Sequence, residues 1–285
     1  MIKNNIWLEV MRKDVEQGME FTELLQRTAD VARGAGGLVL AIKKPEVFTK
    51  EGHSNFVTEA DLASQKYCIG KLSGILPEAH FFAEEQEQNA LEPGYNWVID
   101  PIDGTTNFMR GYRHSAVSIG LVKDGEGVLG VVYNPYTEEL FAAVRGEGAF
   151  LNGAPIQVSQ AAMKDALIVF GTSPYDRGKA AETFSVVQKI FLSCGDIRRS
   201  GSAALDLCYV AAGRCDGFYE GQLSPWDYAA ASVILEEAGG RIGTLEPYRF
   251  SFREQQPIVA GNPEVYEEIR RLSSGGRSAG DGLNQ

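Results

Sequence analysis

The sequence predicts an α/β protein with a layered architecture, and three observations lead to this prediction. The first half is rich in short apolar runs joined by turn residues, which is typical of β-hairpins. The second half alternates short apolar runs with helical patterns, which is typical of βα units. The pattern changes after Ser159, so an internal boundary is expected near residues 153–165. The hydrophobic content of 44% over 285 residues is enough for a full core.

In the first half, two helices are expected before the strands. Residues Glu20–Lys43 carry apolar side chains at helical spacing. Thr58 followed by Asp61 resembles a capping box, which predicts a helix running through Lys71. The Asp124-Gly125 pair predicts a hairpin turn. The apolar runs predict strands at His80–Ala83, Asn96–Ile99, Ser115–Val122, Gly127–Tyr133 and Leu140–Val144.

In the second half, strands and helices are expected to alternate. The strands are expected at Ala166–Phe170, Ile197–Arg199, Gly217–Tyr219 and Ile258–Ala260. The helices are expected at Lys179–Leu192, Ser202–Ala212, Tyr228–Ala238 and Pro263–Leu272. Gly239-Gly240 would end the third of these helices, and Pro263 suits the first position of the last one.

The charge of the chain narrows the classes of ligand. The net charge is −11, from 38 Asp and Glu against 27 Lys and Arg. Such a field repels polyanions, so neither nucleic acid nor an anionic membrane surface is expected as a partner. The same field repels a small phosphate. A phosphate-handling site in this chain would therefore need local basic side chains or bound metal ions.

The most informative stretch is Trp97–Phe108, WVIDPIDGTTNF. An apolar strand delivers Asp100 at its end, and Pro101 is expected to stop that strand. Asp103 follows three residues later, close enough for both carboxylates to face one point. Two such carboxylates repel each other unless a proton or a cation lies between them, and Mg²⁺ prefers oxygen ligands of this kind. Gly104 lets the backbone approach a ligand closely.

Three further motifs are weaker when each is taken alone. Phe81–Glu85 is an apolar run that ends in carboxylates, and such a strand end is usually solvated. Ser224–Asp227 puts an aspartate just before an alanine-rich helix, where an N-cap is the usual role. Arg198-Arg199 precedes Ser200-Gly201 and is more often a salt-bridged strand end than a substrate clamp. Both interpretations of the arginine pair stay open.

Together these residues resemble the inositol monophosphatase family, which belongs to a wider group of lithium-sensitive, magnesium-dependent phosphatases. The resemblance covers roughly Phe21 to Leu272. The matching motifs are Val57-Thr58 with Asp61, Phe82–Glu85, Asp100–Phe108, Gly201–Leu205 and Trp226–Ala230. The resemblance implies a layered αβαβα sandwich of the inositol monophosphatase and fructose bisphosphatase type. It also implies a homodimer, because members of the family commonly form one.

The resemblance further implies two to three Mg²⁺ ions in each site. One ion would be held by Glu84, Asp100, the Thr105 hydroxyl and the Ile102 carbonyl. A second would be held by Asp100, Asp103 and Asp227, and a third, looser ion would lean on Glu84.

The catalytic and substrate residues are implied in the same way. Asp61 and Thr105 would orient the attacking water and help to deprotonate it, and Glu84 completes the catalytic set. Lys50 matches a family lysine by its spacing alone. The substrate would contact Asp103, Gly104, Thr105, Gly201, Ser202, Ala203, Glu220 and Asp227.

The expected organisation follows from these assignments. Residues 1–19 form an N-terminal extension, and residues 20–155 form an α+β half with most of the metal ligands. Residues 156–272 form an α/β half that completes the metal and substrate site, and residues 273–285 form a disordered, Gly- and Ser-rich tail. The chain shows no signal-peptide pattern, no run long enough to span a membrane and no paired cysteines, so a cytoplasmic protein is expected.

The predicted function is magnesium-dependent hydrolysis of a small phosphorylated polyol, with inositol monophosphate as the first candidate. A metal-activated water would attack phosphorus directly. Fructose 1,6-bisphosphate, histidinol phosphate and 3′-phosphoadenosine 5′-phosphate are alternative substrates for the same metal core. A protein that only binds a partner and performs no catalysis is the alternative of a different class.

Overall fold

The computed structural model describes residues 21–49, 56–86, 90–245 and 250–273. The predicted extension at residues 1–19, all but the first residue of the predicted tail, and Lys50 lie outside these ranges.

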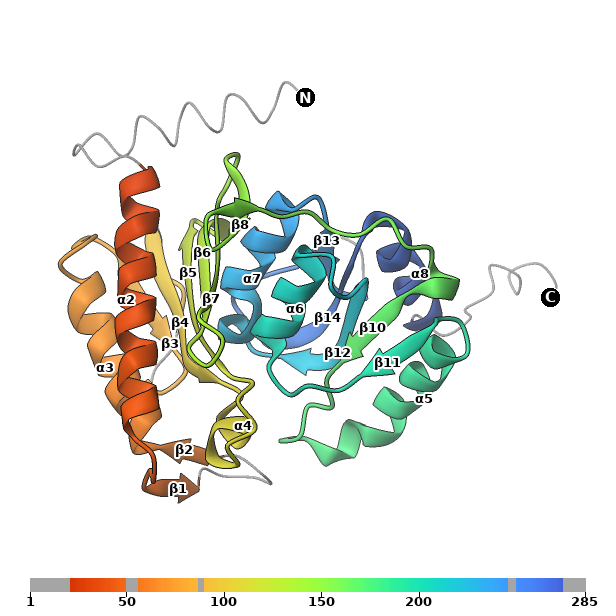
Figure 1. Ribbon diagram of the computed structural model, residues 1–285, viewed down its shortest axis with the longest axis horizontal. Helices are drawn as coiled ribbons and strands as arrows, with labels where there is room; N and C mark the ends of the chain where they lie inside the picture. The colour runs from red at the N-terminus through yellow and green to blue at the C-terminus, as the bar shows by residue number, and fades with distance from the viewer. Residues whose placement is uncertain (1–20, 50–55, 87–89, 246–249, 274–285) are drawn as a thin grey trace, which may run out of the picture.

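Helices and sheets alternate in five layers (Figure 1), which confirms the predicted αβαβα sandwich. The first layer contains α2 (Phe21–Ala41) and α3 (Glu59–Leu72). The middle layer contains α6 (Ala203–Ala211) and α7 (Pro225–Glu237). The last layer contains α5 (Ala180–Phe191) and α8 (Pro263–Ser273). A sheet separates each pair of neighbouring helical layers, so both sheets are buried on two faces.

The first sheet has seven strands that lie in chain order. They are β3 (His80–Ala83), β4 (Tyr95–Asp103), β5 (Ala116–Lys123), β6 (Glu126–Asn134), β7 (Glu139–Val144), β8 (Gly148–Leu151) and β9 (Ala154–Pro155). β3 and β4 are parallel and the other neighbours are antiparallel. Because helices cover both faces, the central strands are continuous apolar runs rather than alternating ones.

The second sheet has five strands in the order β11-β10-β12-β14-β13. They are β10 (Leu167–Phe170), β11 (Asp196–Arg198), β12 (Gly217–Leu223), β13 (Arg241–Gly243) and β14 (Gln256–Gly261). β10 is parallel to both β11 and β12, as βα units require. The first sheet ends at Pro155 and the second begins at Leu167, so we keep the division at residues 155/156 as a proposal.

Several short elements lack a pattern long enough to be predicted. They are β1 (Val47–Thr49), β2 (Phe56–Thr58), α4 (Thr105–Met109), the 3₁₀ turns at Met163–Asp165 and Arg177–Lys179, and the sheet strands β8, β9 and β13. None of the helices within the described residues is long and apolar enough to cross a membrane.

Helix α7 lies directly on the first sheet because glycines face it. A Cβ atom added to Gly130 in β6 would lie 2.1 Å from the carbonyl oxygen of Ala230, and one added to Gly120 in β5 would lie 3.0 Å from the Ala230 nitrogen. The side chains of Ala229, Ala230 and Ala231 are small and buried. This close packing holds the N-terminal turn of α7 beside the end of β4.

Two local predictions are wrong. Pro101 does not stop the strand, because β4 continues to Asp103. Pro101 lies beyond the last pairing with β3, at Ile99, and within an irregularity in the pairing with β5, so its missing N–H leaves no gap in a regular ladder. The second error is the start of α7 at Pro225 rather than Tyr228, which puts Asp227 inside the first turn of the helix.

Candidate metal centre and substrate pocket

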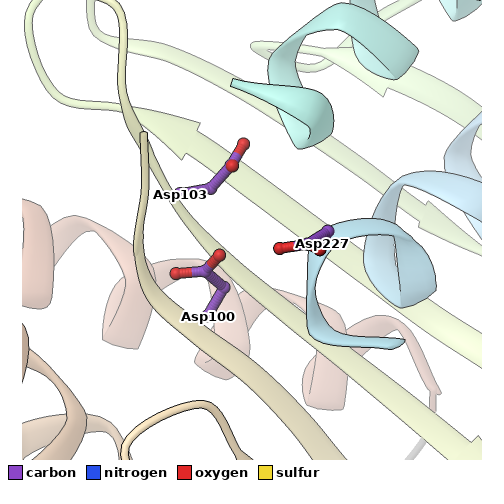
Figure 2. A group of neighbouring side chains, drawn as sticks. All are labelled: Asp100, Asp103 and Asp227. Carbon is purple, nitrogen blue, oxygen red and sulfur yellow. The ribbon is translucent and has the colours of Figure 1, made fainter. Parts of the chain in front are cut away.

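Three aspartates form an acidic cluster at the end of β4. Asp100 and Asp103 come from β4, and Asp227 comes from the first turn of α7. One carboxylate oxygen from each lies within 4.8 Å of one from each of the others. Figure 2 shows the three side chains around a common space, with Asp227 approaching from the helix opposite the strand. Asp100 and Asp103 are buried and Asp227 is half-buried.

The electrostatics of this cluster favour a bound cation. Loss of hydration, followed by repulsion from Glu84, Asp103 and Asp227, raises the pKa of Asp100 well above its ordinary value. Loss of hydration and the charge of Asp103 do the same to the pKa of Asp227. A set of hard oxygen ligands that repel one another is the donor set that Mg²⁺ prefers. The residues present therefore fit the metal that the sequence predicted.

The N-terminal end of α6 holds Asp103 in place. The Ser202 hydroxyl donates to Asp103 Oδ2 at 2.5 Å, and the Ala204 N–H donates to the same oxygen at 2.8 Å. These hydrogen bonds lower the pKa of Asp103, but burial dominates and raises it to about 6. Since Oδ2 is occupied, Oδ1 is the oxygen free to face a ligand.

Asp61 and Asp227 have the same local role in their helices. Each is the third residue of its helix and completes a capping box, with the N–H of Thr58 donating to Asp61 at 2.8 Å and that of Ser224 donating to Asp227 at 2.7 Å. A capping box fixes one carboxylate oxygen and the orientation of the side chain. The second oxygen of each carboxylate is left for the site.

Thr105 lies between two other predicted site residues. Its hydroxyl is 3.2 Å from Asp61 Oδ1 and 3.2 Å from the carbonyl oxygen of Ile102. The Ile102 N–H donates to Asp100 Oδ1 at 3.0 Å. The structure thus brings the Thr105 hydroxyl close to the Ile102 carbonyl, which the resemblance assigned to the metal, and to the Asp61 carboxylate, which it assigned to the water.

The turn after β4 packs against the loop before α6. Gly104 has a φ of 93°, and a Cβ atom there would lie 3.1 Å from the carbonyl oxygens of both Gly201 and His114. Asn107 Nδ2 donates to the carbonyls of His114 at 2.7 Å and Ser200 at 3.0 Å. The glycine and asparagine of the DGTTN string therefore join the two halves of the chain at the site.

A cavity of about 540 Å³ opens beside the cluster. Every predicted site residue lines it except Asp61, which is buried behind Thr105. The cavity is strongly acidic, since seven carboxylates line it: Glu84, Asp100, Asp103, Asp176, Asp206, Glu220 and Asp227.

Glu220 is fixed in the wall of the cavity. The N–H of Ser173 donates to Glu220 Oε1 at 2.7 Å. A Cβ atom at Gly171 would lie 1.8 Å from Glu220 Oε2, so only glycine leaves room for this carboxylate. Burial raises the pKa of Glu220 to about 7, against the hydrogen bond from Ser173.

Sequence analysis missed several residues of the pocket. Asp206 is buried and accepts from the Ser200 hydroxyl at 2.5 Å, and Ser173 holds Glu220. The signal for Asp206 was a single acid within the apolar run Ala203–Ala212. Ser173 had no such signal, because the loop that contains it has no regular pattern.

Comparison with known proteins agrees with this arrangement. A model of the inositol monophosphatase family matches residues 15–275. The Nus factor SuhB of Escherichia coli strain K12 is 40% identical over 251 residues, which is 86% of this chain and 94% of that protein. The inositol-1-monophosphatase of Rhizobium meliloti is 38% identical over 224 residues, 78% of this chain and 84% of that protein.

A solved structure gives the same result for the fold. The crystal structure of the extragenic suppressor protein suhB from Bartonella henselae has a TM-score of 0.83 and 35% identity, and the match covers 89% of this chain and 99% of that one. The sequence motifs, the layered fold and the acidic cluster all agree with these matches, and the chain belongs to the inositol monophosphatase family.

Proposed function

We propose that this protein hydrolyses small phosphate monoesters with Mg²⁺, and that inositol monophosphate is its first substrate. The observation that carries the proposal is one cavity lined by two kinds of acidic group. The clustered carboxylates of Asp100, Asp103 and Asp227 line it, and so does the carboxylate of Glu220, which is fixed by the Ser173 N–H. A phosphate held through cations would suit the cluster, and a polyol held by hydrogen bonds would suit Glu220.

The ligands we propose are those that the sequence suggested. Glu84, Asp100, Thr105 and the Ile102 carbonyl would hold one ion. Asp100, Asp103 and Asp227 would hold a second, and a third would lean on Glu84. When bound, the ions supply positive charge to the phosphate and make a nearby water more acidic.

The chain itself would position the water and the phosphate. Asp61 has one oxygen within hydrogen-bond distance of the Thr105 hydroxyl, so the pair can accept and pass on a proton from an attacking water. The N–H groups of Gly104 and Thr105 begin the turn into α4, where backbone N–H groups are free to bind phosphate oxygens.

Another part of the cavity wall would select the alcohol part of the substrate. We assign this role to Glu220 with Gly201, Ser202 and Ala203, all of which line the cavity. A carboxylate that accepts hydrogen bonds from neighbouring hydroxyls favours a polyol. Fructose 1,6-bisphosphate, histidinol phosphate and 3′-phosphoadenosine 5′-phosphate remain the alternative substrates.

The test is phosphate release from a panel of these four substrates, with and without Mg²⁺. Magnesium-dependent release that is fastest with inositol 1-phosphate supports the proposal in full. Faster release from another member changes the substrate and keeps the chemistry. No release from any member with Mg²⁺ would contradict the proposed function.

A role that needs no turnover is the second candidate, because a 40% identical relative is named a Nus factor. The test is to replace SuhB in Escherichia coli with this chain and, separately, with its Asp100→Asn variant. Equal replacement by both would favour the second candidate. Replacement by the unmodified chain alone would tie any such role to the metal site. The predicted homodimer and the expected lack of a nucleic-acid partner stay predictions.

A further inference from the structure

Two neighbouring arginines, Arg198 and Arg199, end up in different surroundings. Both arginines are exposed, but only Arg198 forms an ion pair within the described residues, with Asp196, and it donates to the carbonyl of Ile197 at 2.8 Å. Arg199 follows the end of β11 and lines the cavity. The sequence left a salt-bridged strand end and a substrate clamp as alternatives. Arg198 fits the first interpretation and Arg199 fits the second.

Arg199 is the one basic side chain among the described residues that line the cavity, against seven carboxylates. Four of these carboxylates, Glu84 and the three aspartates of the acidic cluster, are the proposed ligands of the metal ions. Arg199 interacts electrostatically with two of the remaining carboxylates. Its charge lowers the pKa of both Glu220 and Asp206, although burial raises the pKa of each overall. The guanidinium therefore belongs to the part of the cavity wall that carries Glu220 and Asp206.

The Arg199 guanidinium has space beside Gly201 and N–H donors that few protein groups use. Its Nη2 donates to the Thr172 hydroxyl at 3.4 Å, a long hydrogen bond. Its Nη1 would lie 2.6 Å from a Cβ atom at Gly201, so the glycine makes space for the guanidinium. Within the described residues no carboxylate forms an ion pair with it. Most of its five N–H donors are therefore available to a ligand.

We propose that Arg199 forms a subsite for a second anionic group, a phosphate or carboxylate separate from the group that is hydrolysed, on those substrates that carry one. This inference rests on the proposed function, since it assumes that the scissile phosphate lies at the acidic cluster. The planar guanidinium fork matches the oxygens of phosphate and carboxylate and can bind two of them at once. In so acidic a cavity, a second anion has no other basic side chain among the lining residues to bind.

The test compares two substrates that differ only in the second anion, fructose 1-phosphate and fructose 1,6-bisphosphate, in saturating Mg²⁺. The ratio of their kcat/KM values is measured for the unmodified enzyme, Arg199→Ala, Arg199→Lys and the matched control Arg198→Ala. We expect Arg199→Ala to lower kcat/KM for the bisphosphate tenfold or more, mainly through KM, since a hydrogen bond to a charged group contributes about 1.5–3 kcal/mol. The monophosphate should change less than about threefold by the same reasoning.

The other variants and the salt concentration sharpen the result. Arg199→Lys keeps the charge without the fork and should recover part of the preference, and Arg198→Ala should keep all of it. The preference should shrink as salt is added, because the contact is between charges.

The outcomes separate the subsite from the proposed function. Equal losses with both substrates in Arg199→Ala, or no loss at all, would overturn the subsite while leaving the phosphatase in place. Release from the monophosphate but not from the bisphosphate by the unmodified enzyme would overturn it too. Inositol 1-phosphate serves as the reference substrate. Its hydrolysis without release from either fructose phosphate would overturn the subsite and leave the proposed function in place, whereas no release from any of the three would contradict both.

Discussion

At the scale of single residues, Asp100 is the centre of the proposed metal site. Its carboxylate is buried, its pKa is raised well above the ordinary value by burial and by neighbouring acids, and two of the three proposed ions would use it as a ligand. Asp100→Asn should abolish nearly all turnover, a loss of at least about a thousandfold if it removes 4 kcal/mol or more of transition-state stabilisation. Steady-state phosphate release measures this.

The same substitution should leave the metal-free fold intact or make it more stable, because it removes a charge from a crowded acidic site. Thermal unfolding without metal tests this second expectation. Asp165→Asn, at an exposed position whose carboxylate lies 3.9 Å from the Lys164 ammonium, is the matched control and should change neither property. Wild-type turnover in Asp100→Asn would rule out Asp100 as a ligand shared by two metal ions.

Glu220 gives a prediction about pH. Burial raises its pKa from 4.5 to about 7, so the folded state holds its proton more tightly than the unfolded state does. Its contribution to stability is therefore fully present below about pH 4.5 and is lost as the pH rises through about 7. A difference of that size amounts to about 3 kcal/mol.

Urea unfolding of metal-free protein from pH 4 to 8 measures this effect. The fall in stability with rising pH should be smaller in Glu220→Gln than in the unmodified protein. It should not vanish, because the other buried acids remain in both proteins. Glu78→Gln, at an exposed position, should follow the unmodified protein. Parallel curves for Glu220→Gln and the unmodified protein would contradict the raised pKa.

At the scale of elements, the contact between α7 and the first sheet decides where Asp227 lies. Gly130→Ala should force α7 away from β6, because the new Cβ atom would lie 2.1 Å from the carbonyl of Ala230. We expect a loss of about 1–3 kcal/mol of stability from this overpacking, together with weaker Mg²⁺ binding. Chemical unfolding and calorimetric titration of Mg²⁺ measure the two effects.

The chain offers a matched control for this change. Gly37 lies inside α2 with nothing within 4 Å of an added Cβ atom. Gly37→Ala should stabilise the protein by about 1 kcal/mol and leave Mg²⁺ binding unchanged. Weaker Mg²⁺ binding in Gly37→Ala, or unchanged Mg²⁺ binding in Gly130→Ala, would contradict the claim that the position of α7 on the sheet determines Mg²⁺ binding.

Asn107 gives the second prediction at this scale, because it joins the turn at α4 to the loop before α6. Asn107→Ala leaves two carbonyl groups without their donor, which should cost about 1–3 kcal/mol of stability. KM should rise more than Mg²⁺ affinity falls, since the neighbouring Gly201 lines the pocket but is no proposed metal ligand. Asn107→Asp, which has a similar shape without the donors, should behave alike. An unchanged KM in both variants would contradict this role.

At the scale of the whole molecule, metal and fold should be linked through pH. Without metal, buried carboxylates with raised pKa values make the fold less stable as the pH rises toward neutrality. Mg²⁺ binds their charged forms, so the rise in Tm that Mg²⁺ causes should grow between pH 5 and 8. At a hundred times its Kd, the ion should stabilise the fold by about 2.7 kcal/mol. A Tm shift that is independent of pH, or that persists in Asp227→Asn, would contradict the linkage.

Most of the fold could be predicted from the sequence because its signals are local. The predicted strand at His80–Ala83 has the same bounds in the structure, and the helix expected at Pro263–Leu272 differs by one residue. Apolar periodicity and capping residues act within one element, so they can be recognised from one sequence without knowledge of the tertiary structure. The short strands β1 and β2 and the bulge that carries β4 past Pro101 depend on neighbouring strands and were not predicted.

The sequence by itself determined the class of the protein and the residue types of its site. The motif Asp100–Phe108 contains two candidate metal-binding aspartates, a glycine and a joining asparagine within nine positions. The family resemblance implied which distant residues meet them, but only the tertiary structure decided how they are brought there. Asp227 reaches the cluster because glycines in β5 and β6 let α7 lie on the sheet, and Glu220 fits its wall because Gly171 leaves room. The difference between Arg198 and Arg199 was likewise decided by which side chain faces the cavity, because spacing along a chain carries no information about packing between layers.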